Sequence, residues 1–204
     1  MSIMKLRQNF IDRTARKPRG EWARKNYNAP KAHYKSFRII LDKLQLTEDD
    51  TYVEIGCGGG VLLEQALQVV SKAAAIDHSA EMIETTERRL QNIDADRIDL
   101  VTGDAAELPW DNESFSAAAG ANMFFFLEEP QKVLSEIFRV LRPGGRLAIV
   151  TMSNSIIGKI SFGWLFSLKT YSDEKMTAML AAAGFRTIEV KSGISPIQIC
   201  YAKK

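Results

Sequence analysis

From residue 51 to the end of the chain, short apolar segments alternate with longer amphipathic ones. The short segments predict β-strands, and the longer ones, in which apolar residues recur every three or four positions, predict helices. The predicted strands are 51–56, 72–77, 97–102, 114–120, 145–151, 185–191 and 196–203, and the predicted helices are 60–70, 80–91, 129–141 and 172–183. Strands that alternate with helices predict a mainly parallel sheet with right-handed crossovers.

The last two predicted strands depart from this alternation. Only residues 192–195 separate them, which is too short for a crossover helix, so we expect an antiparallel hairpin. Pro143-Gly144-Gly145 and Gly184 mark the ends of the helices that precede them. Residues 31–45 predict a further helix over one sheet face. The whole pattern therefore predicts an α/β fold with a doubly wound sheet.

The composition is that of one ordinary globular domain. Of 204 residues, 46% are hydrophobic and 25% are charged, which excludes wholesale disorder. No apolar run approaches the ~20 residues that cross a bilayer. The N-terminus is basic and polar, so we expect no export signal and a cytoplasmic protein. Cys57 and Cys200 lie far apart without metal-ligand spacing, so we expect two reduced thiols and no metal.

Charge is distributed unevenly along the chain. Residues 1–43 carry 12 Lys/Arg and 3 Asp/Glu, a net charge of +9, which leaves 15 bases and 22 acids, a net charge of −7, for the remainder. We therefore predict a basic arm with a lid helix over 1–45 and a single globular unit over 46–204. Such an arm suits an anionic contact, but it could equally be a solvated helix that balances the charge of the body.

Glycines separate the first predicted strand from the helix that follows it. The chain reads VEIGCGGG over residues 53–60, and backbone without Cβ atoms lets a ligand approach closely. A dinucleotide fingerprint would need glycine at its sixth position, where the chain has Val61 or Leu63, and a P-loop would need Lys-Ser/Thr after the glycines. An acid-x-Gly-x-Gly-x-Gly motif that begins at Glu54 remains.

Acidic residues follow the next two predicted strands. Asp77 ends the second strand, where an acid in a doubly wound fold accepts hydrogen bonds from ribose hydroxyls. Asp104 follows the third strand, where it could accept from an adenine amine while the Ala105 amide donates to a ring nitrogen. Each position has an alternative interpretation as a helix cap, with Asp77 or Ser79 capping the next helix and Asp104 capping a short helix at 105–108.

Four segments in this order resemble the class I S-adenosylmethionine-dependent methyltransferases of the Methyltransf_11 type, which include quinone-biosynthesis methyltransferases. They are residues 53–60, 76–82, 103–109 and 137–145, within a resemblance that runs from about Thr51 to Phe185. The resemblance implies a Rossmann-like seven-stranded sheet. It also implies methyl transfer from S-adenosyl-L-methionine, with S-adenosyl-L-homocysteine as the product.

The resemblance further implies which residues bind the cofactor. The glycine turn would lie under the methionine part, supported by Glu54, and residues at the end of the fourth strand would face the methionyl amine and the sulfonium. His78 and Met82 would border the adenine. The implied cofactor-binding residues are Glu54, Gly56, Cys57, Gly58, Asp77, His78, Met82, Asp104, Ala105, Ala121 and Asn122.

Departures from the family pattern concern the acceptor side. Phe124-Phe125-Phe126 replaces a His pair of many relatives, which removes a potential base and makes this end of the site apolar. A sulfonium already reacts readily, so the protein needs mainly to align donor and acceptor. Tyr27, His33 and Tyr34 are the candidates for a catalytic role, with packing or surface exposure as the alternative for each.

The expected acceptor is small and lipophilic or aromatic. Residues 155–168 are rich in Ile, Phe, Leu and Trp, and they predict either a core helix or an apolar substrate pocket or membrane-facing lid. The predicted pocket residues are Phe124, Phe125, Phe162 and Trp164.

Other functions remain open at this point. The basic arm, with Trp22 and Tyr27, could dock on anionic lipid at the inner membrane face, in which case the acceptor would be a phospholipid headgroup. A nucleic-acid-binding protein is disfavoured, because the familiar motifs are missing from the sequence and the body is acidic. A cofactor binder without transferase activity is compatible with the shortage of bases. We expect a monomer or a homodimer.

Overall fold

The computed structural model describes residues 33–154, 168–193 and 196–204. Within these ranges one sheet has the strand order β3-β2-β1-β4-β5-β7-β6. Its strands are β1 (Thr51–Ile55), β2 (Lys72–Asp77), β3 (Ile98–Thr102), β4 (Phe115–Ala121), β5 (Leu141–Met152), β6 (Arg186–Ser192) and β7 (Ile197–Lys203).

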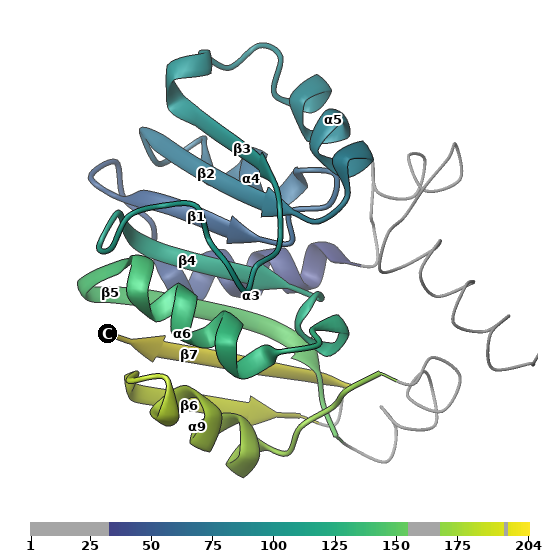
Figure 1. Ribbon diagram of the computed structural model, residues 1–204, viewed down its shortest axis with the longest axis vertical. Helices are drawn as coiled ribbons and strands as arrows, with labels where there is room; N and C mark the ends of the chain where they lie inside the picture. The colour runs from purple at the N-terminus through teal and green to yellow at the C-terminus, as the bar shows by residue number, and fades with distance from the viewer. Residues whose placement is uncertain (1–32, 155–167, 194–195) are drawn as a thin grey trace, which may run out of the picture.

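Strand directions place several polar residues at one edge of the sheet. Strands β1 to β5 are joined by parallel pairing, whereas β7 runs antiparallel to both β5 and β6 (Figure 1). The mainly parallel sheet and the C-terminal antiparallel hairpin are therefore confirmed. Since β1 to β4 end on the same side, the glycine turn after β1 lies beside Asp77 at the end of β2.

Helices cover both faces of the sheet, as predicted for a doubly wound α/β fold. The helices α3 (Tyr34–Leu44), α4 (Val61–Ala66) and α5 (Ala80–Arg89) share one buried apolar cluster. The helices α6 (Pro130–Val140) and α9 (Asp173–Ala182) belong to the other. In Figure 1, α6 and α9 lie in front of the sheet and α3 behind it.

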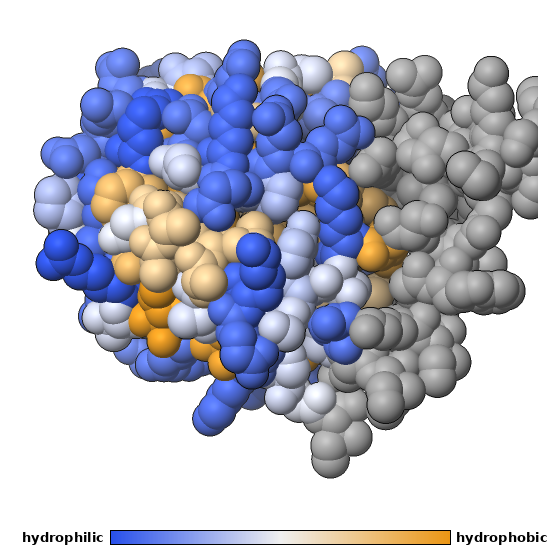
Figure 2. All heavy atoms as spheres, turned by 60° about the horizontal axis from the view of Figure 1, so that its bottom comes forward, coloured by the Kyte–Doolittle hydropathy of each residue, from blue (hydrophilic) through white to orange (hydrophobic). Residues whose placement is uncertain are grey.

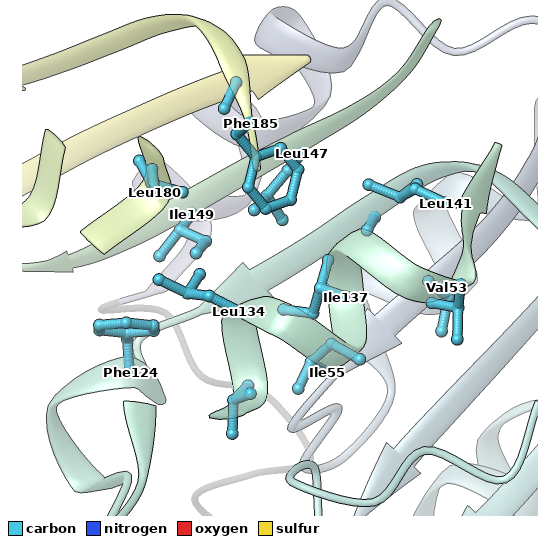
Figure 3. Close-up of a cluster of buried hydrophobic side chains, with 14 of the residues drawn as sticks. Val53, Ile55, Phe124, Leu134, Ile137, Leu141, Leu147, Ile149, Leu180 and Phe185 are labelled. Carbon is cyan, nitrogen blue, oxygen red and sulfur yellow. The ribbon is translucent and has the colours of Figure 1, made fainter. Parts of the chain in front are cut away.

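The core between α6 and the sheet holds the strand ends rigidly. Leu134 and Ile137 are 0% and 2% exposed, and they lie close to Ile55 and Ile149 on the sheet (Figure 3). Full burial of each such side chain stabilises the fold by about 1.5–3 kcal/mol. Along β1, Val53 and Ile55 face this cluster and Tyr52 faces the other. Because side chains alternate along a strand, the side chain of Glu54 lies on the same side as that of Tyr52.

Helix α3 is the described part of the predicted lid helix. Its apolar residues Phe37, Ile40 and Leu44 are 7%, 0% and 0% exposed, a spacing of three and four that faces the sheet. The helix contacts β4 and β5 and so contributes to the core. The division of the chain at residue 45 stays a prediction, since residues 1–32 lie outside the described ranges.

Pro143-Gly144-Gly145, which we expected to mark a helix end, lies within β5. Leu141 pairs with Phe115, and regular pairing resumes with Arg146 opposite Ala117, so residues 142–145 form an irregularity in the strand. Gly144 has φ +77° there, a conformation that glycine adopts readily.

The outer surface of α9 carries small apolar side chains beside polar and charged ones. Figure 2 shows apolar side chains surrounded by charged ones on the face that lies at the bottom of Figure 1. On α9 the exposed positions include Ala178, Ala181 and Ala182, small side chains of a kind that is normal on protein surfaces.

Within the described ranges, no helix combines the length and apolar character that crossing a bilayer requires.

Candidate cofactor-binding and active site

A cavity of about 660 Å³ lies at the carboxyl ends of β1 to β4. Its volume is within the range of small-molecule sites. The residues implied for cofactor binding all line it, although they come from four strands and the connections after them: Glu54, Gly56, Cys57, Gly58, Asp77, His78, Met82, Asp104, Ala105, Ala121 and Asn122. The fold therefore brings these residues together, while their roles stay predictions.

Side chains of α5 fix the glycine turn from the side away from β1. Thr86 Oγ1 donates to the carbonyl of Gly58 at 2.9 Å, and Arg89 Nε donates to the carbonyl of Gly59 at 2.6 Å. Arg89 also pairs with Glu64 at 2.9 Å. These contacts hold the backbone that forms the cavity floor, and no sequence motif indicated them.

Two positions in the turn require glycine. Gly56 has φ +72°, and an added Cβ would lie 2.9 Å from Cβ of Met123. Gly60 has φ +74°, and its Cβ would lie 2.7 Å from Cγ2 of Thr86. Both the backbone conformation and the close neighbours exclude side chains, so the glycines serve a tight turn at the cavity wall.

Asp77 is held by two backbone amides. Its Oδ2 accepts from Gly58 N and its Oδ1 accepts from Ser79 N, both at 2.9 Å, and His78 Nδ1 lies 3.5 Å from Oδ1. Ser79 is the N-cap residue of α5 but makes no side-chain cap. The N-cap residue of α5 is therefore Ser79 and not Asp77, and the interpretation of Asp77 as a helix cap is wrong. Each carboxylate oxygen has further acceptor capacity, so ribose binding is compatible with these bonds.

Asp104 forms a turn rather than a helix cap. Its Oδ1 accepts from Ala106 N at 2.9 Å, and Glu107 N donates to its carbonyl at 3.0 Å. The chain does not continue into the short helix predicted at 105–108, so that expectation is corrected. Proline follows shortly, and Pro109 cannot donate the amide hydrogen bond that would extend the turn.

Glu54 and Asn122 each bury a polar atom that has no hydrogen-bond partner among the described residues. Glu54 is 2% exposed, and burial, followed by the charge of Asp77, raises the pKa of its carboxyl group, while a hydrogen bond from the Leu63 amide opposes the shift. Asn122 Oδ1 accepts from Ser36 Oγ at 3.4 Å, and its Nδ2 is the unpartnered atom.

Asn122 has φ +56°, a left-handed conformation that asparagine tolerates better than most residues. Its backbone amide donates to Val150 O at 2.8 Å, which fixes the end of β4 against β5. The Glu54 carboxyl group on β1 and the Asn122 amide directly after the adjacent β4 thus line one cavity. Such a pair suits the ammonium and the carboxylate of an α-amino acid.

The thiols do not provide a reactive group. Cys57 and Cys200 are both buried and form no disulfide. Burial raises the pKa of the Cys57 thiol, as does the charge of Asp77, and burial raises that of Cys200 to about 12. Since the thiolate is the nucleophile and metal ligand, neither residue is activated. No group of His, Cys, Asp and Glu within the described ranges is placed to hold a metal ion.

The phenylalanine segment divides between core and cavity. Phe124 is 1% exposed and packs against Tyr171, with ring centroids 6.0 Å apart. Phe126 lines the cavity, and Phe125 packs on Phe126 without lining it. The three residues form a 3₁₀-helix, in which successive side chains point about 120° apart. Phe162 and Trp164 lie outside the described residues.

His33 and Phe37 bring α3 to the cavity wall. Their rings meet edge to face with centroids 6.2 Å apart, and burial lowers the pKa of His33. A neutral imidazole can accept a proton. Tyr34 is 43% exposed and is not among the lining residues, and Tyr27 lies outside the described ranges. The sequence interpretation did not include Phe37, although it follows His33 by one helical turn.

Comparison with known proteins indicates a family for part of the chain. Residues 53–149 match the Methyltransf_11 family, described as a methyltransferase domain. This part of the chain is therefore similar to a methyltransferase domain. It is 25% identical over 189 residues to the demethylmenaquinone methyltransferase of Oceanobacillus iheyensis, and the match covers 78% of this chain and 79% of that protein. Another relative, a 37.1-kDa protein of a Streptomyces fradiae transposon, is 35% identical over 119 residues, and the match covers 57% of this chain and only 33% of the relative.

Solved structures agree on the fold of the methyltransferase domain. A methyltransferase solved in complex with the Trm112 methyltransferase activator of Haloferax volcanii superimposes with a TM-score of 0.77 at 19% identity, covering 91% of this chain and 98% of that one. Phospholethanolamine N-methyltransferase 2 of Haemonchus contortus, in complex with phosphomonomethylethanolamine and S-adenosylhomocysteine, gives 0.73 at 18% identity, covering 91% of this chain and 46% of that one. These similarities establish the Rossmann-like sheet.

The polar groups that line the cavity fit S-adenosylmethionine. Asp77 ends β2 and Asp104 follows β3, while Glu54 on β1 and Asn122 directly after β4 each carry a polar atom without a partner among the described residues. The strand order β3-β2-β1-β4 therefore presents acceptors for an adenine and a ribose, and then groups for an amino acid, along one line.

Proposed function

We propose that the protein transfers a methyl group from S-adenosylmethionine to a small lipophilic or aromatic acceptor. The observation that carries the proposal is that all eleven implied cofactor residues line one cavity, with two buried polar atoms that have no partner in the described part of the chain. An unpaired buried polar group costs about 1–3 kcal/mol, so a ligand that satisfies both atoms would recover this free energy.

In this proposal, successive strand ends bind successive parts of the cofactor. Asp104 and Ala105 contact the adenine after β3, and Asp77 accepts from the ribose hydroxyls after β2. Glu54 and Asn122 bind the methionyl end between β1 and β4. The two backbone amides on Asp77 keep its carboxylate in position before the ligand arrives, so little ordering is needed on binding.

The remaining cavity wall would bind the acceptor. S-adenosylmethionine supplies an electrophilic methyl group when it is bound. Phe37, Phe126 and Leu127 line the same cavity and would exclude water and favour an apolar acceptor. His33 also lines this cavity and could remove a proton from an acceptor hydroxyl or amine, since burial lowers the pKa of its imidazole.

The relative from Oceanobacillus iheyensis supports this choice of acceptor, because its name specifies a quinone. The test has two stages. Calorimetry with S-adenosylmethionine should give a dissociation constant in the micromolar range, and a screen of phenols, quinols and lipophilic amines should then yield a methylated product detected by mass spectrometry. Binding without any product would support a cofactor binder that lacks transferase activity.

A phospholipid headgroup is the second candidate acceptor. Two observations favour it: the fold similarity to Phospholethanolamine N-methyltransferase 2 and the net charge of +9 over residues 1–43, which suits an anionic surface. Flotation with anionic vesicles, with and without residues 1–30, tests this candidate, and equal recovery of both chains rejects membrane docking. A cytoplasmic or membrane-peripheral location and a monomeric or homodimeric state stay predictions.

A further inference from the structure

Glu54 is a carboxyl group that the cavity buries with no Lys or Arg among the described residues that line it. The residue is 2% exposed, and its Oε2 has no hydrogen-bond partner among the described residues. Its carboxyl group receives one backbone hydrogen bond, from Leu63. The described side chains that line the cavity include five carboxyl groups and neither Lys nor Arg, so the charge around Glu54 is negative.

This environment opposes ionisation of Glu54. Removing a carboxylate from water without a partner costs several kcal/mol, and such a group normally keeps its proton instead. Asp77, on the neighbouring β2, adds a like charge and raises the pKa of Glu54 further. A single backbone hydrogen bond does not compensate for both effects. Both effects favour the neutral acid at Glu54 in the free protein.

We propose that Glu54 releases this proton to solvent when the positively charged methionyl end of the cofactor binds beside it. The O–H bond of the acid ionises, the electron pair stays on the carboxylate, and the carboxylate pairs with the incoming cation. This inference rests on the proposed function, since it requires a cofactor with a cationic end. It makes cofactor affinity dependent on pH, with stronger binding as pH rises.

Other titratable groups lie near Glu54 or line the same cavity, and they differ from it in burial or in hydrogen bonding. Tyr52 on the same strand and Cys57 in the glycine turn have pKa values raised by burial, so both stay neutral as Glu54 ionises. Asp77 on β2 already accepts two amide hydrogen bonds. On the far walls, His33 from α3 and His78 after β2 line the cavity. Of these groups, Glu54 alone combines burial with an unpartnered carboxyl oxygen.

The proton can be counted by calorimetry. S-adenosylmethionine is titrated into the full chain in phosphate and in Tris, whose ionisation enthalpies differ, between about pH 6 and pH 9. We expect the release of about one proton at the pH where Glu54 is neutral in the free protein and ionised in the complex. Across that interval the dissociation constant should fall up to about tenfold per pH unit.

Variants identify the group that loses the proton. Glu54→Gln keeps the shape of the side chain without an ionisable proton, and it should bind with no proton release and with an affinity independent of this ionisation. Glu84→Gln is the matched control, because Glu84 is exposed on α5, and it should behave as the wild-type chain. Proton release that persists unchanged in Glu54→Gln would assign the proton to another group and overturn the inference.

A truncated ligand tests which part of the cofactor is responsible. Methylthioadenosine has no amino acid group, so it should bind without proton release, whereas S-adenosylhomocysteine keeps the ammonium group and should release the proton. Equal heats in both buffers when S-adenosylmethionine binds the wild-type chain would reject the assignment to Glu54 and leave the proposed function intact. Failure of the ligand to bind at any pH would reject the proposed function itself.

Discussion

Replacing Asp77 by Asn tests the part of the site on which the assignment of the cofactor most depends. The change preserves the shape of the side chain and removes its negative charge. In the free protein the Asp77 carboxylate accepts hydrogen bonds from the backbone amides of Gly58 and Ser79. In the variant, one of these two amides loses its acceptor oxygen. The half-buried turn should therefore be destabilised by about 1 kcal/mol, and the protein should still fold.

The effect on cofactor binding should be larger. A hydrogen bond to a charged group contributes about 1.5–3 kcal/mol, and the ribose offers two hydroxyl donors to the Asp77 carboxylate. Loss of the charged acceptor should cost about 3 kcal/mol in binding, which weakens the dissociation constant for S-adenosylmethionine about 100-fold. Isothermal titration calorimetry measures the affinity, and thermal unfolding measures the fold separately.

Asp99→Asn is the matched control for this prediction. Asp99 accepts a 2.6 Å hydrogen bond from Trp110 Nε1 and does not line the cavity, so its variant should bind the cofactor as the wild-type chain does. If Asp77→Asn binds with wild-type affinity while its unfolding temperature is also unchanged, the assignment of the ribose to Asp77 is wrong.

Three further predictions concern the acceptor wall and the fold. Phe124→Ala should destabilise the protein by about 3 kcal/mol because it leaves a cavity in the core. Phe126→Ala should instead keep the unfolding temperature within about 2 °C of the wild-type value and raise KM for the acceptor. The reverse pattern would contradict the placement of the two residues. Asp50→Asn breaks a buried ion pair with Arg146 and should cost about 3 kcal/mol. Arg146 holds the pKa of Asp50 well below its usual range. The stabilisation is therefore present above about pH 4 and is lost as pH falls towards the lowered pKa. In an acid titration, the variant should not show this loss of stability. His33→Asn should lower kcat about 100-fold with unchanged cofactor affinity, and wild-type kcat should decline only as pH falls through the lowered pKa of His33; a kcat equal to that of the wild type excludes the base.

The sequence was sufficient to predict the sheet and to predict which residues meet at the carboxyl ends of its strands. Strand ends followed by glycine or by an acid are local patterns, and parallel strands bring their ends to one edge, so Glu54, Asp77 and Asp104 could be placed together before the structure was known. The side of the sheet on which Glu54 lies also follows from alternation along β1.

The acceptor wall could not be predicted in the same way. Whether Phe124 or Phe126 enters the cavity depends on the phase of a single 3₁₀ turn, and hydrophobicity is the same for both. The anchors of the glycine turn, Thr86 and Arg89, come from α5, about thirty residues along the chain, and such contacts form only in the tertiary structure. The unpartnered Nδ2 of Asn122 likewise depends on its left-handed backbone.

The most direct test of the account is the structure of the full chain with S-adenosylhomocysteine bound. The account predicts the adenine at Asp104 and Ala105, the ribose hydroxyls on the Asp77 carboxylate, and the amino acid end between Glu54 Oε2 and Asn122 Nδ2. A ligand bound outside this cavity, or in the reverse direction with its adenine at Glu54 and Asn122, would contradict it.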